Sequence, residues 1–257
     1  MKIAIITGAS QGIGREFALQ LDRMLQTTDE IWLIARNKEK LDETAKMMRN
    51  NTRVIPLDLT DSFSLEALEI MLEENKPSIR FLVNAAGFGL LGDFDAIPIA
   101  EQEKEIELNC KALTRITRSC IPYMSWNGRI IQVASSAAFL PQPQFAVYAA
   151  TKSYVLSFSR ALASELKGAG IYVTAVCPGP VDTEFFERAE KYGKNFGLKA
   201  MIMANPYEVV KKAIRDSYFR RQTSVYSITI LGFELMAKFI PHSVLLAGYG
   251  LLKKFDK

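Results

Sequence analysis

Two side chains that could act as an acid-base pair stand four residues apart in the stretch QFAVYAATKSYV. They are the phenol of Tyr148 and the ammonium of Lys152, and no glycine or proline interrupts the run between them. On a helix, residues four apart are neighbours on one face. The spacing allows two interpretations: a surface pair with no role in chemistry, or one device that moves a proton.

The chemistry of such a device is proton transfer to or from an oxygen atom. A free phenol has a pKa of about 10, which is too high for a base at neutral pH. A positive charge about 4 Å away, at an effective dielectric constant of about 20, interacts with the phenolate by roughly 4 kcal/mol. Because one pKa unit corresponds to about 1.4 kcal/mol, we expect Lys152 to lower the pKa of Tyr148 by up to ~3 units.

A second group of residues suits a bound phosphate. The first apolar run is followed by TGASQGIG, which places Gly8, Gly12 and Gly14 at the start of an amphipathic stretch. Small residues between a strand and a helix let the backbone approach a pyrophosphate at the helix N-terminus. The alternative is a plain strand-to-helix turn, but the position directly after the first strand favours a phosphate site.

Alternating strands and helices must position these residues. The pattern predicts strands at residues 2–7, 30–35, 52–57, 79–85, 128–134, 171–176 and 223–230, separated by amphipathic helices such as 13–26, 38–50 and 64–74. Several strands are apolar throughout, as burial on both faces requires. We therefore expect an α/β fold: a Rossmann-like three-layer α/β/α sandwich with a doubly wound parallel sheet of about seven strands, in a single domain over residues 1–257. Such sheets bind ligands beyond the carboxyl ends of their strands.

Composition argues against several functions. The 257 residues carry a mild and scattered net charge of +4, which does not suggest nucleic-acid binding. The single histidine, His242, and the three separated cysteines offer no metal-ligand spacing, so no metal site is predicted. The strand that starts at Lys2 leaves no room for a signal peptide, and we expect a cytoplasmic protein.

The motifs, taken in order, resemble those of the short-chain dehydrogenase/reductase family. They are TGxxxGIG from Thr7, LDLT around Asp58, NAAG at residues 84–87, IELNCKAL around Asn109, Ser135 thirteen residues before Tyr148, YAATK, and PGPVDT at residues 178–183. The match covers roughly residues 1–215, and ordered motifs of this number are specific.

The resemblance implies an NAD(P)-dependent oxidoreductase that transfers a hydride between the nicotinamide and a carbonyl or alcohol. It implies that Tyr148 is the general acid or base and that Lys152 also holds the nicotinamide ribose. Ser135 would bind the substrate oxygen, and Asn109 would anchor a water that links Lys152 to solvent. The cofactor-binding residues that it implies are Gly8, Ser10, Gln11, Gly12, Ile13, Gly14, Arg36, Asp58, Leu59, Asn84, Ala85, Gly87, Tyr148, Lys152, Pro178, Gly179, Val181 and Thr183.

The end of the second strand bears on the choice between the two nicotinamide cofactors. Relatives that use NAD usually carry an acidic residue there, whereas this chain has Ala35 and Arg36 in LIARNKEKL. A guanidinium suits a 2′-phosphate, so NADP(H) is expected rather than NAD(H). The glycine turn has Gln11 before Gly12 and offers no second basic residue there.

The residues expected on the substrate side are mostly apolar: Phe88, Leu90, Phe139, Phe145, Phe185 and Phe186. Residues 184–206 are expected to form a lid. An apolar lid suggests a hydrophobic substrate such as a 3-oxoacyl compound, a steroid or another ketone. Any one of these aromatic residues could instead pack in the core.

The apolar tail, residues 231–257, is too short between its charges and Pro241 to span a bilayer, and we expect two short amphipathic helices there. It could close the substrate pocket, pack at a subunit interface or lie on a membrane surface, and the first two are favoured. Members of the family usually form homodimers or homotetramers.

Three functions fit these observations. The first is an NADP(H)-dependent reductase or dehydrogenase acting on a carbonyl or secondary alcohol. The second is a non-catalytic sensor that binds NADP(H), which would need only the glycine turn and not Asn109, Ser135, Tyr148 and Lys152 together. The third is a lipid-modifying reductase at a membrane surface, which differs in location rather than in chemistry.

Overall fold

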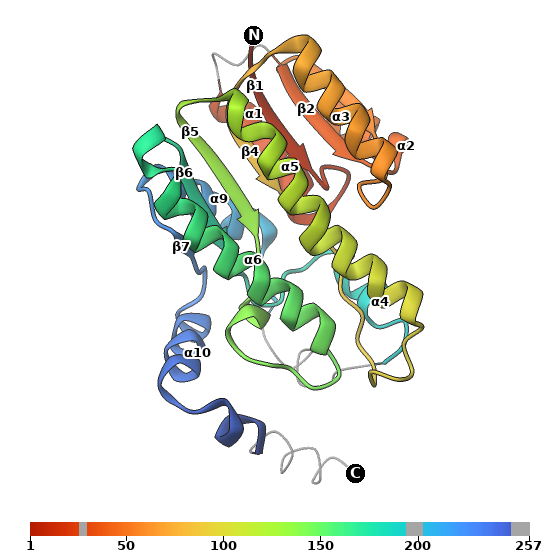
Figure 1. The fold of residues 1–257 in the computed structure, drawn as a ribbon, viewed down its shortest axis with the longest axis vertical. Helices are drawn as coiled ribbons and strands as arrows, with labels where there is room; N and C mark the ends of the chain where they lie inside the picture. The colour runs from red at the N-terminus through yellow and green to blue at the C-terminus, as the bar shows by residue number, and fades with distance from the viewer. Residues whose placement is uncertain (26–29, 194–202, 248–257) are drawn as a thin grey trace.

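A central parallel sheet lies between two layers of helices in the computed structural model, which describes residues 1–25, 30–193 and 203–247 (Figure 1). Its strands are β1 Lys2–Thr7, β2 Glu30–Ala35, β3 Thr52–Pro56, β4 Ser78–Asn84, β5 Met124–Val133, β6 Tyr172–Val176 and β7 Thr223–Ser224. Their order is β3-β2-β1-β4-β5-β6-β7, and every neighbouring pair is parallel. The expected α/β/α sandwich with a seven-stranded doubly wound sheet is confirmed.

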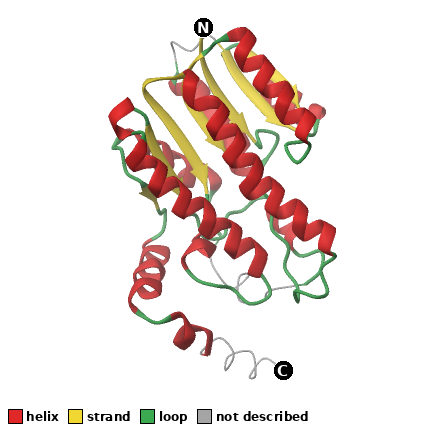
Figure 2. Ribbon diagram, in the orientation of Figure 1, coloured by secondary structure: helices red, strands yellow, loops and turns green. Residues whose placement is uncertain are grey.

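The helices follow the strands along the chain (Figure 2). They are α1 Gly12–Met24, α2 Lys38–Lys46, α3 Ser62–Asn75, α4 Ile99–Ile106, the π-helical turn η1 Glu107–Ala112, α5 Leu113–Cys120, α6 Ala146–Glu165, α7 Phe185–Ala189, α9 Pro206–Tyr218 and α10 Ile228–Phe239, with short 3-10 turns at Ile121–Tyr123 (η2), Ser136–Phe139 (η3) and Lys167–Ala169 (η4). Side-chain caps start four of the α-helices, α2, α3, α9 and α10. For example, Asn37 accepts a hydrogen bond from the Lys40 amide and Asp61 accepts one from the Ser64 amide.

Each strand sends alternate side chains to opposite faces of the sheet, and both faces are buried. Ala4 and Ile6 of β1 belong to the core under α1 and α9, whereas Ile3 and Ile5 belong to the core under α3, α5 and α6. All four side chains have no exposed surface. This two-sided burial explains why the strands are apolar throughout rather than alternating.

The strand order reverses next to β1, and this reversal positions the site. The chain moves from β1 to β2 and β3 on one side, then crosses back to place β4 on the other side of β1. The loops that follow β1 and β4 therefore leave the sheet in opposite directions, and a crevice opens between them. Thr7 joins the two strand ends, since its hydroxyl oxygen accepts hydrogen bonds from the amides of Ala85 and Ala86, both at 3.2 Å.

The last predicted strand, residues 223–230, is wrong over most of its length. Only Thr223 and Ser224 pair with β6, and α10 begins at Ile228. The hydroxyl of Ser227 accepts a hydrogen bond from the Thr229 amide, which caps the helix. The β-branched residues that suggested a strand are overridden by this cap, and the side chain of Ile230 packs against the loop at Gly179.

The part of the tail that the structure describes extends away from the sheet (Figure 1). Residues 228–239 form α10 and residues 242–247 form a further helical segment, so the expectation of two short helices is met up to residue 247. In α10, Ile230 and Ala237 are buried, whereas Ile228 and Phe239 are 88% and 77% exposed. No helix within the described ranges is both long and apolar enough to cross a membrane. Residues 248–257 lie outside the described part of the chain.

Candidate active site

A cavity of about 710 Å³ opens at the carboxyl ends of the strands. The residues that line it come from the loops after β1 to β6 and from the helical elements α1, α4, η1, α6 and α7. The cavity brings together nearly all the predicted cofactor residues: Gly8, Ser10, Gln11, Gly12, Ile13, Gly14, Arg36, Asp58, Leu59, Ala85, Gly87, Tyr148, Lys152, Pro178, Gly179, Val181 and Thr183. Ser135 also lines it.

The glycine turn after β1 cannot accept a side chain at Gly8 or at Gly14. Gly8 has a φ of +69°, and a Cβ there would lie 2.8 Å from the backbone nitrogen of Ala86. A Cβ at Gly14 would lie 2.1 Å from the backbone oxygen of Gly8. The turn is thus a bare backbone cradle that leads into the N-terminus of α1, which suits the diphosphate of a dinucleotide.

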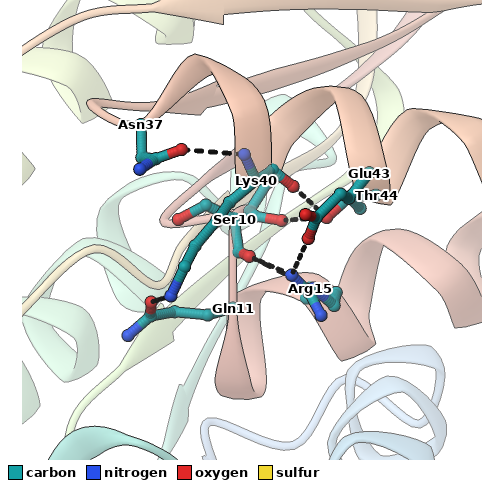
Figure 3. Close-up of polar contacts among 8 residues, drawn as sticks. Ser10, Gln11, Arg15, Asn37, Lys40, Glu43 and Thr44 are labelled. Carbon is teal, nitrogen blue, oxygen red and sulfur yellow. Dashed lines mark hydrogen bonds and ion pairs between the residues drawn. The ribbon is translucent and has the colours of Figure 1, made fainter.

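Polar contacts fasten this turn to α1 and α2 (Figure 3). The guanidinium of Arg15 donates two hydrogen bonds to the backbone oxygen of Ser10, at 3.1 and 2.7 Å. The Thr44 hydroxyl donates to the backbone oxygen of Ala9 at 3.1 Å. The turn is therefore held in place from two helices rather than by its own geometry alone.

Besides Arg15, two basic side chains lie near the turn, Arg36 and Lys40, and the sequence identified only Arg36. Arg36 is exposed and lines the cavity just after β2. The ammonium of Lys40, one turn into α2, donates a hydrogen bond to the Gln11 side chain at 3.0 Å (Figure 3). The turn itself contains no basic residue, but Lys40 of α2 places a positive charge beside Gln11. The signal in the sequence that could have identified Lys40 is its position at the start of α2, four residues after Arg36.

Asp58 and Asn84 have different surroundings, although both were predicted to bind the cofactor. Asp58 lines the cavity and accepts hydrogen bonds from the amide and hydroxyl of Thr60, at 3.0 and 2.7 Å. Asn84 does not line the cavity, because it is buried and donates to the Thr117 hydroxyl at 3.0 Å. Its amide links β4 to α5, so direct contact between its side chain and the cofactor is not supported.

Tyr148 and Lys152 occupy the first two turns of α6 and face the cavity. Tyr148 is only 7% exposed, and its ring stacks on Phe145 with centroids 4.2 Å apart. Phe185 of α7 packs on the same ring at 5.4 Å. The Lys152 ammonium lies 5.6 Å from the centroid of the Tyr148 ring and donates to the backbone oxygen of Val133 at 2.8 Å. The pair is therefore a buried one, not a surface accident.

Burial decides the acid-base properties of both groups. Loss of water raises the pKa of the Tyr148 phenol, although contact with the Ser135 hydroxyl acts in the opposite direction. Burial also lowers the pKa of Lys152 to about 8. The expected lowering of the phenol pKa by Lys152 is thus not found in the protein alone, because desolvation of the phenolate raises the pKa and the charge of Glu105 acts in the same direction.

Asn109 lies beneath the site rather than in its wall. It stands in the π-helical turn η1, an irregularity that often marks functional positions. Its side chain bonds both backbone groups of Phe88, donating to the oxygen at 2.8 Å and accepting from the amide at 3.1 Å. It also donates to the Thr151 hydroxyl at 3.1 Å. Asn109 therefore joins the loop after β4 to α6.

Ser135 leaves β5 at the point where the 3-10 turn η3 begins. Its hydroxyl accepts a hydrogen bond from the Ala137 amide at 3.1 Å, and the neighbouring Ser136 amide donates to the backbone oxygen of Pro178 at 2.8 Å. These bonds hold Ser135 against the loop that contains Gly179. Ser135, rather than Ser136, interacts with the phenol of Tyr148.

The wall of the cavity near Tyr148 is aromatic. Phe88, Phe145, Phe185 and Phe186 line the cavity, as expected for the substrate side. The other two candidates do not: Leu90 packs with Phe88 and Ile97, and Phe139 packs with the cluster around Val155. Of the expected lid, residues 194–202 lie outside the described residues.

One cation in this wall was not foreseen from the sequence. The Arg188 guanidinium lies 3.4 Å from the centre of the Phe88 ring and lines the cavity, together with Lys104. Burial lowers the pKa of Arg188, and the positive charge of Arg36 acts in the same direction. The only signal for Arg188 in the sequence is its place on the same helix as Phe185 and Phe186.

This geometry suits a dinucleotide and a small substrate. The cavity is lined by the backbone of the glycine turn at the N-terminus of α1, by the basic Arg36 after β2 and by the acidic Asp58 after β3. It is also lined by the hydroxyl of Ser135, the phenol of Tyr148 and the ammonium of Lys152. Fold and site together define an oxidoreductase that uses a nicotinamide cofactor.

Comparison with known proteins gives the family. The model of the short chain dehydrogenase family matches residues 2–192, and the chain belongs to that family. It is 30% identical over 206 residues to an uncharacterized oxidoreductase of Staphylococcus epidermidis, covering 79% of this chain and 88% of the relative.

Two solved structures resemble the chain over nearly its whole length. One is a short-chain dehydrogenase from Sphingobium yanoikuyae in complex with NADPH, with a TM-score of 0.79, 29% identity and coverage of 98% and 96% of the two chains. The other is a bulky-bulky ketone specific alcohol dehydrogenase from Comamonas testosteroni, with a TM-score of 0.73, 25% identity and coverage of 98% and 94%.

The bare cradle yields a first prediction. Gly14→Ala places a methyl group against the Gly8 backbone, and overpacking of this kind costs about 1–3 kcal/mol. We expect a lower free energy of unfolding in urea and weaker NADPH binding, followed by cofactor fluorescence. Gly168→Ala is the matched control, since nothing lies within 4 Å of a Cβ there. Equal behaviour of the two variants would contradict the role of the cradle.

Proposed function

We propose that this protein is an NADP(H)-dependent oxidoreductase that interconverts a ketone and a secondary alcohol on a hydrophobic substrate. The observation that carries the proposal is the meeting of Ser135, Tyr148 and Lys152 in one cavity with the glycine cradle. The aromatic wall around Tyr148 supports an apolar substrate. The similarity to an NADPH-bound dehydrogenase and to a bulky ketone dehydrogenase points in the same direction.

The cofactor would be held along the cavity from Arg36 to Tyr148. The amides of the turn at Gly12 and Ile13 would bind its diphosphate, and Arg36, with Lys40 behind Gln11, would bind the 2′-phosphate. Asp58 would contact the adenine, and Lys152 would hold the nicotinamide ribose. When bound, the cofactor supplies or accepts the hydride.

The protein's own residues handle the proton. Ser135 donates a hydrogen bond to the substrate oxygen and orients it, and Tyr148 donates its phenol proton to the same oxygen during reduction. The ammonium of Lys152 stabilises the phenolate that results. Because burial raises the pKa of the phenol, Tyr148 is held protonated in the free enzyme and is ready to act as an acid.

The direct test is a panel of hydrophobic ketones and secondary alcohols followed by NADPH absorbance. Reduction of a bulky ketone with NADPH is the expected result. Tight NADPH binding without turnover on any member of the panel would favour the alternative, a non-catalytic sensor of NADP(H).

Removal of the phenol hydroxyl tests the mechanism. In Tyr148→Phe we expect kcat to fall by about 10²–10⁴-fold, the usual contribution of general acid-base catalysis, with the affinity for NADPH little changed. Tyr154→Phe is the matched control, because Tyr154 lies on the same helix with 42% of its surface exposed. Activity near that of the wild type in Tyr148→Phe would rule out this role.

Removal of the guanidinium at the end of β2 tests the cofactor preference. In Arg36→Ala we expect NADPH affinity to fall by about 10–100-fold, since a hydrogen bond to a charged group contributes about 1.5–3 kcal/mol. NADH affinity should change much less. Arg23→Ala, which removes the same charge from the far end of α1, should change neither. Equal losses for both cofactors in Arg36→Ala would count against the NADP(H) assignment.

A further inference from the structure

A buried carboxyl group stands beside the active site without any role in the chemistry described above. Glu105 lies on α4, one helical turn before Asn109, and its side chain has no exposed surface. Neither carboxyl oxygen makes a well-formed hydrogen bond within the part of the chain that the structure describes, and the backbone amide of Leu90 is the one donor that favours its ionised form. Burial of such a group costs several kcal/mol in general, so a purely structural reason for Glu105 is lacking.

The charged and titratable groups that face Glu105 come from three elements. They are Tyr148 and Lys152 of α6, Arg188 of α7 and Cys110 of η1. Burial raises the pKa of Glu105 to about 8, even though the positive charges of Lys152 and Arg188 favour its ionised form. At neutral pH the carboxyl group of Glu105 is therefore mostly protonated. It becomes negatively charged in the same pH range, near 8, in which Lys152 loses its proton.

Glu105 lines a second, small cavity of about 20 Å³. This volume is enough for one water molecule. Its wall includes Ala146 and Val147, the first turn of α6, where no side chain caps the helix. The wall also reaches the surface, because Phe94 is 64% exposed and the Gln144 amide donates to Asp93 there.

We propose that Glu105 is a proton-holding residue of the active site, a charged neighbour of Lys152 that also lines a water-sized cavity with Gln144 in its wall. The proposal rests on the proposed function, in which Tyr148 loses a proton at each reduction. Glu105 does not line the large cavity, so it acts through Lys152 and not on the substrate.

The proton steps balance as follows for reduction. The O–H bond of Tyr148 breaks, and its proton goes to the carbonyl oxygen while the carbonyl carbon accepts the hydride. The phenolate then takes a proton from the ammonium of Lys152. The carboxylic acid of Glu105 returns a proton to Lys152 through an intervening water, and the carboxylate is protonated again from solvent through the small cavity. One hydride and one solvent proton are consumed for each carbonyl group.

Infrared spectroscopy of the ligand-free protein tests the protonation state without any turnover. We expect a carboxylic acid band in the wild type that disappears as the pH rises through about 8. The band should be absent in Glu105→Gln and present in Glu103→Gln, the control on the exposed face of the same helix. Absence of a protonated carboxyl in the wild type at neutral pH would overturn the proposal.

The pH dependence of turnover tests the coupling to Lys152. Without the carboxylate, Lys152 loses its proton more easily, so the alkaline limb of kcat in Glu105→Gln should move to lower pH by about one unit. We also expect kcat to fall several-fold with the KM for NADPH unchanged. Glu105→Asp should restore part of the wild-type profile. If kcat of Glu105→Gln depends on pH as it does in the wild type, the proposal is wrong.

Measurements of the free energy of unfolding test the proposal without any enzyme activity. Because the folded-state pKa of Glu105 is raised, the folded protein binds more protons than the unfolded chain between about pH 4 and pH 8. The free energy of unfolding of the wild type, relative to that of Glu105→Gln, should therefore fall across this range and level off above it. A difference that does not vary with pH would contradict the proposal.

A second variant covers the case in which Glu105→Gln folds poorly. Glu105→Met replaces the carboxyl by an apolar group of similar length, and it should be at least as stable as the wild type since it removes an unpaired buried polar group. Loss of stability in Glu105→Met would indicate a structural role and overturn the proposal. If no oxidoreductase activity is found at all, the infrared band and the pH-dependent stability still decide the state of Glu105 independently.

Discussion

The site depends most on the hydrogen bonds of one amide, that of Asn109. This side chain bonds both backbone groups of Phe88 and the hydroxyl of Thr151, so it fixes the loop after β4 to α6. The loop then brings Gly87 so close that a Cβ there would lie 3.3 Å from the Lys152 ammonium. Because the loop carries one wall of the cavity and α6 carries Tyr148 and Lys152, the two halves of the site keep a fixed separation. Asn109 lies in the π-helical turn η1, and from there its side-chain amide reaches both Phe88 and Thr151.

Desolvation is the second constraint on the chemistry. Tyr148, Lys152 and Glu105 are all nearly or completely inaccessible to water, and burial shifts the pKa of each toward its neutral form. A charge that forms during the reaction is therefore stabilised by neighbouring groups and not by solvent. This makes the mutual interactions of the three groups stronger than they would be on a surface. It also means that their protonation states change together.

The two ends of the cavity differ in character for a physical reason. The end of the cavity next to β2 is lined by backbone and by exposed polar groups such as Arg36, which suits an ionic group. At the other end, Phe145 and Phe185 pack around the Tyr148 ring and exclude water. The Arg188 guanidinium lies over the Phe88 ring in the aromatic wall, close enough to Arg36 for the two positive charges to repel each other.

The amino-acid sequence by itself determined the alternation of strands and helices and the parallel sheet, because periodicity is a local property. Its resemblance to the short-chain dehydrogenase/reductase family proposed Asn109, Ser135, Tyr148 and Lys152 as the catalytic residues. The sequence-based prediction failed at residues 223–230, where a capping serine outweighed β propensity, and at Asn84, whose side chain is turned into the core. Only the tertiary structure decided which side chains face one another. It brought Lys40 to Gln11, placed Arg188 over Phe88, enclosed Glu105 beside Lys152 and reversed the expected pKa shift of Tyr148. Each of these outcomes depends on burial or on contact between distant segments, and neither is encoded in the spacing of residues along the chain.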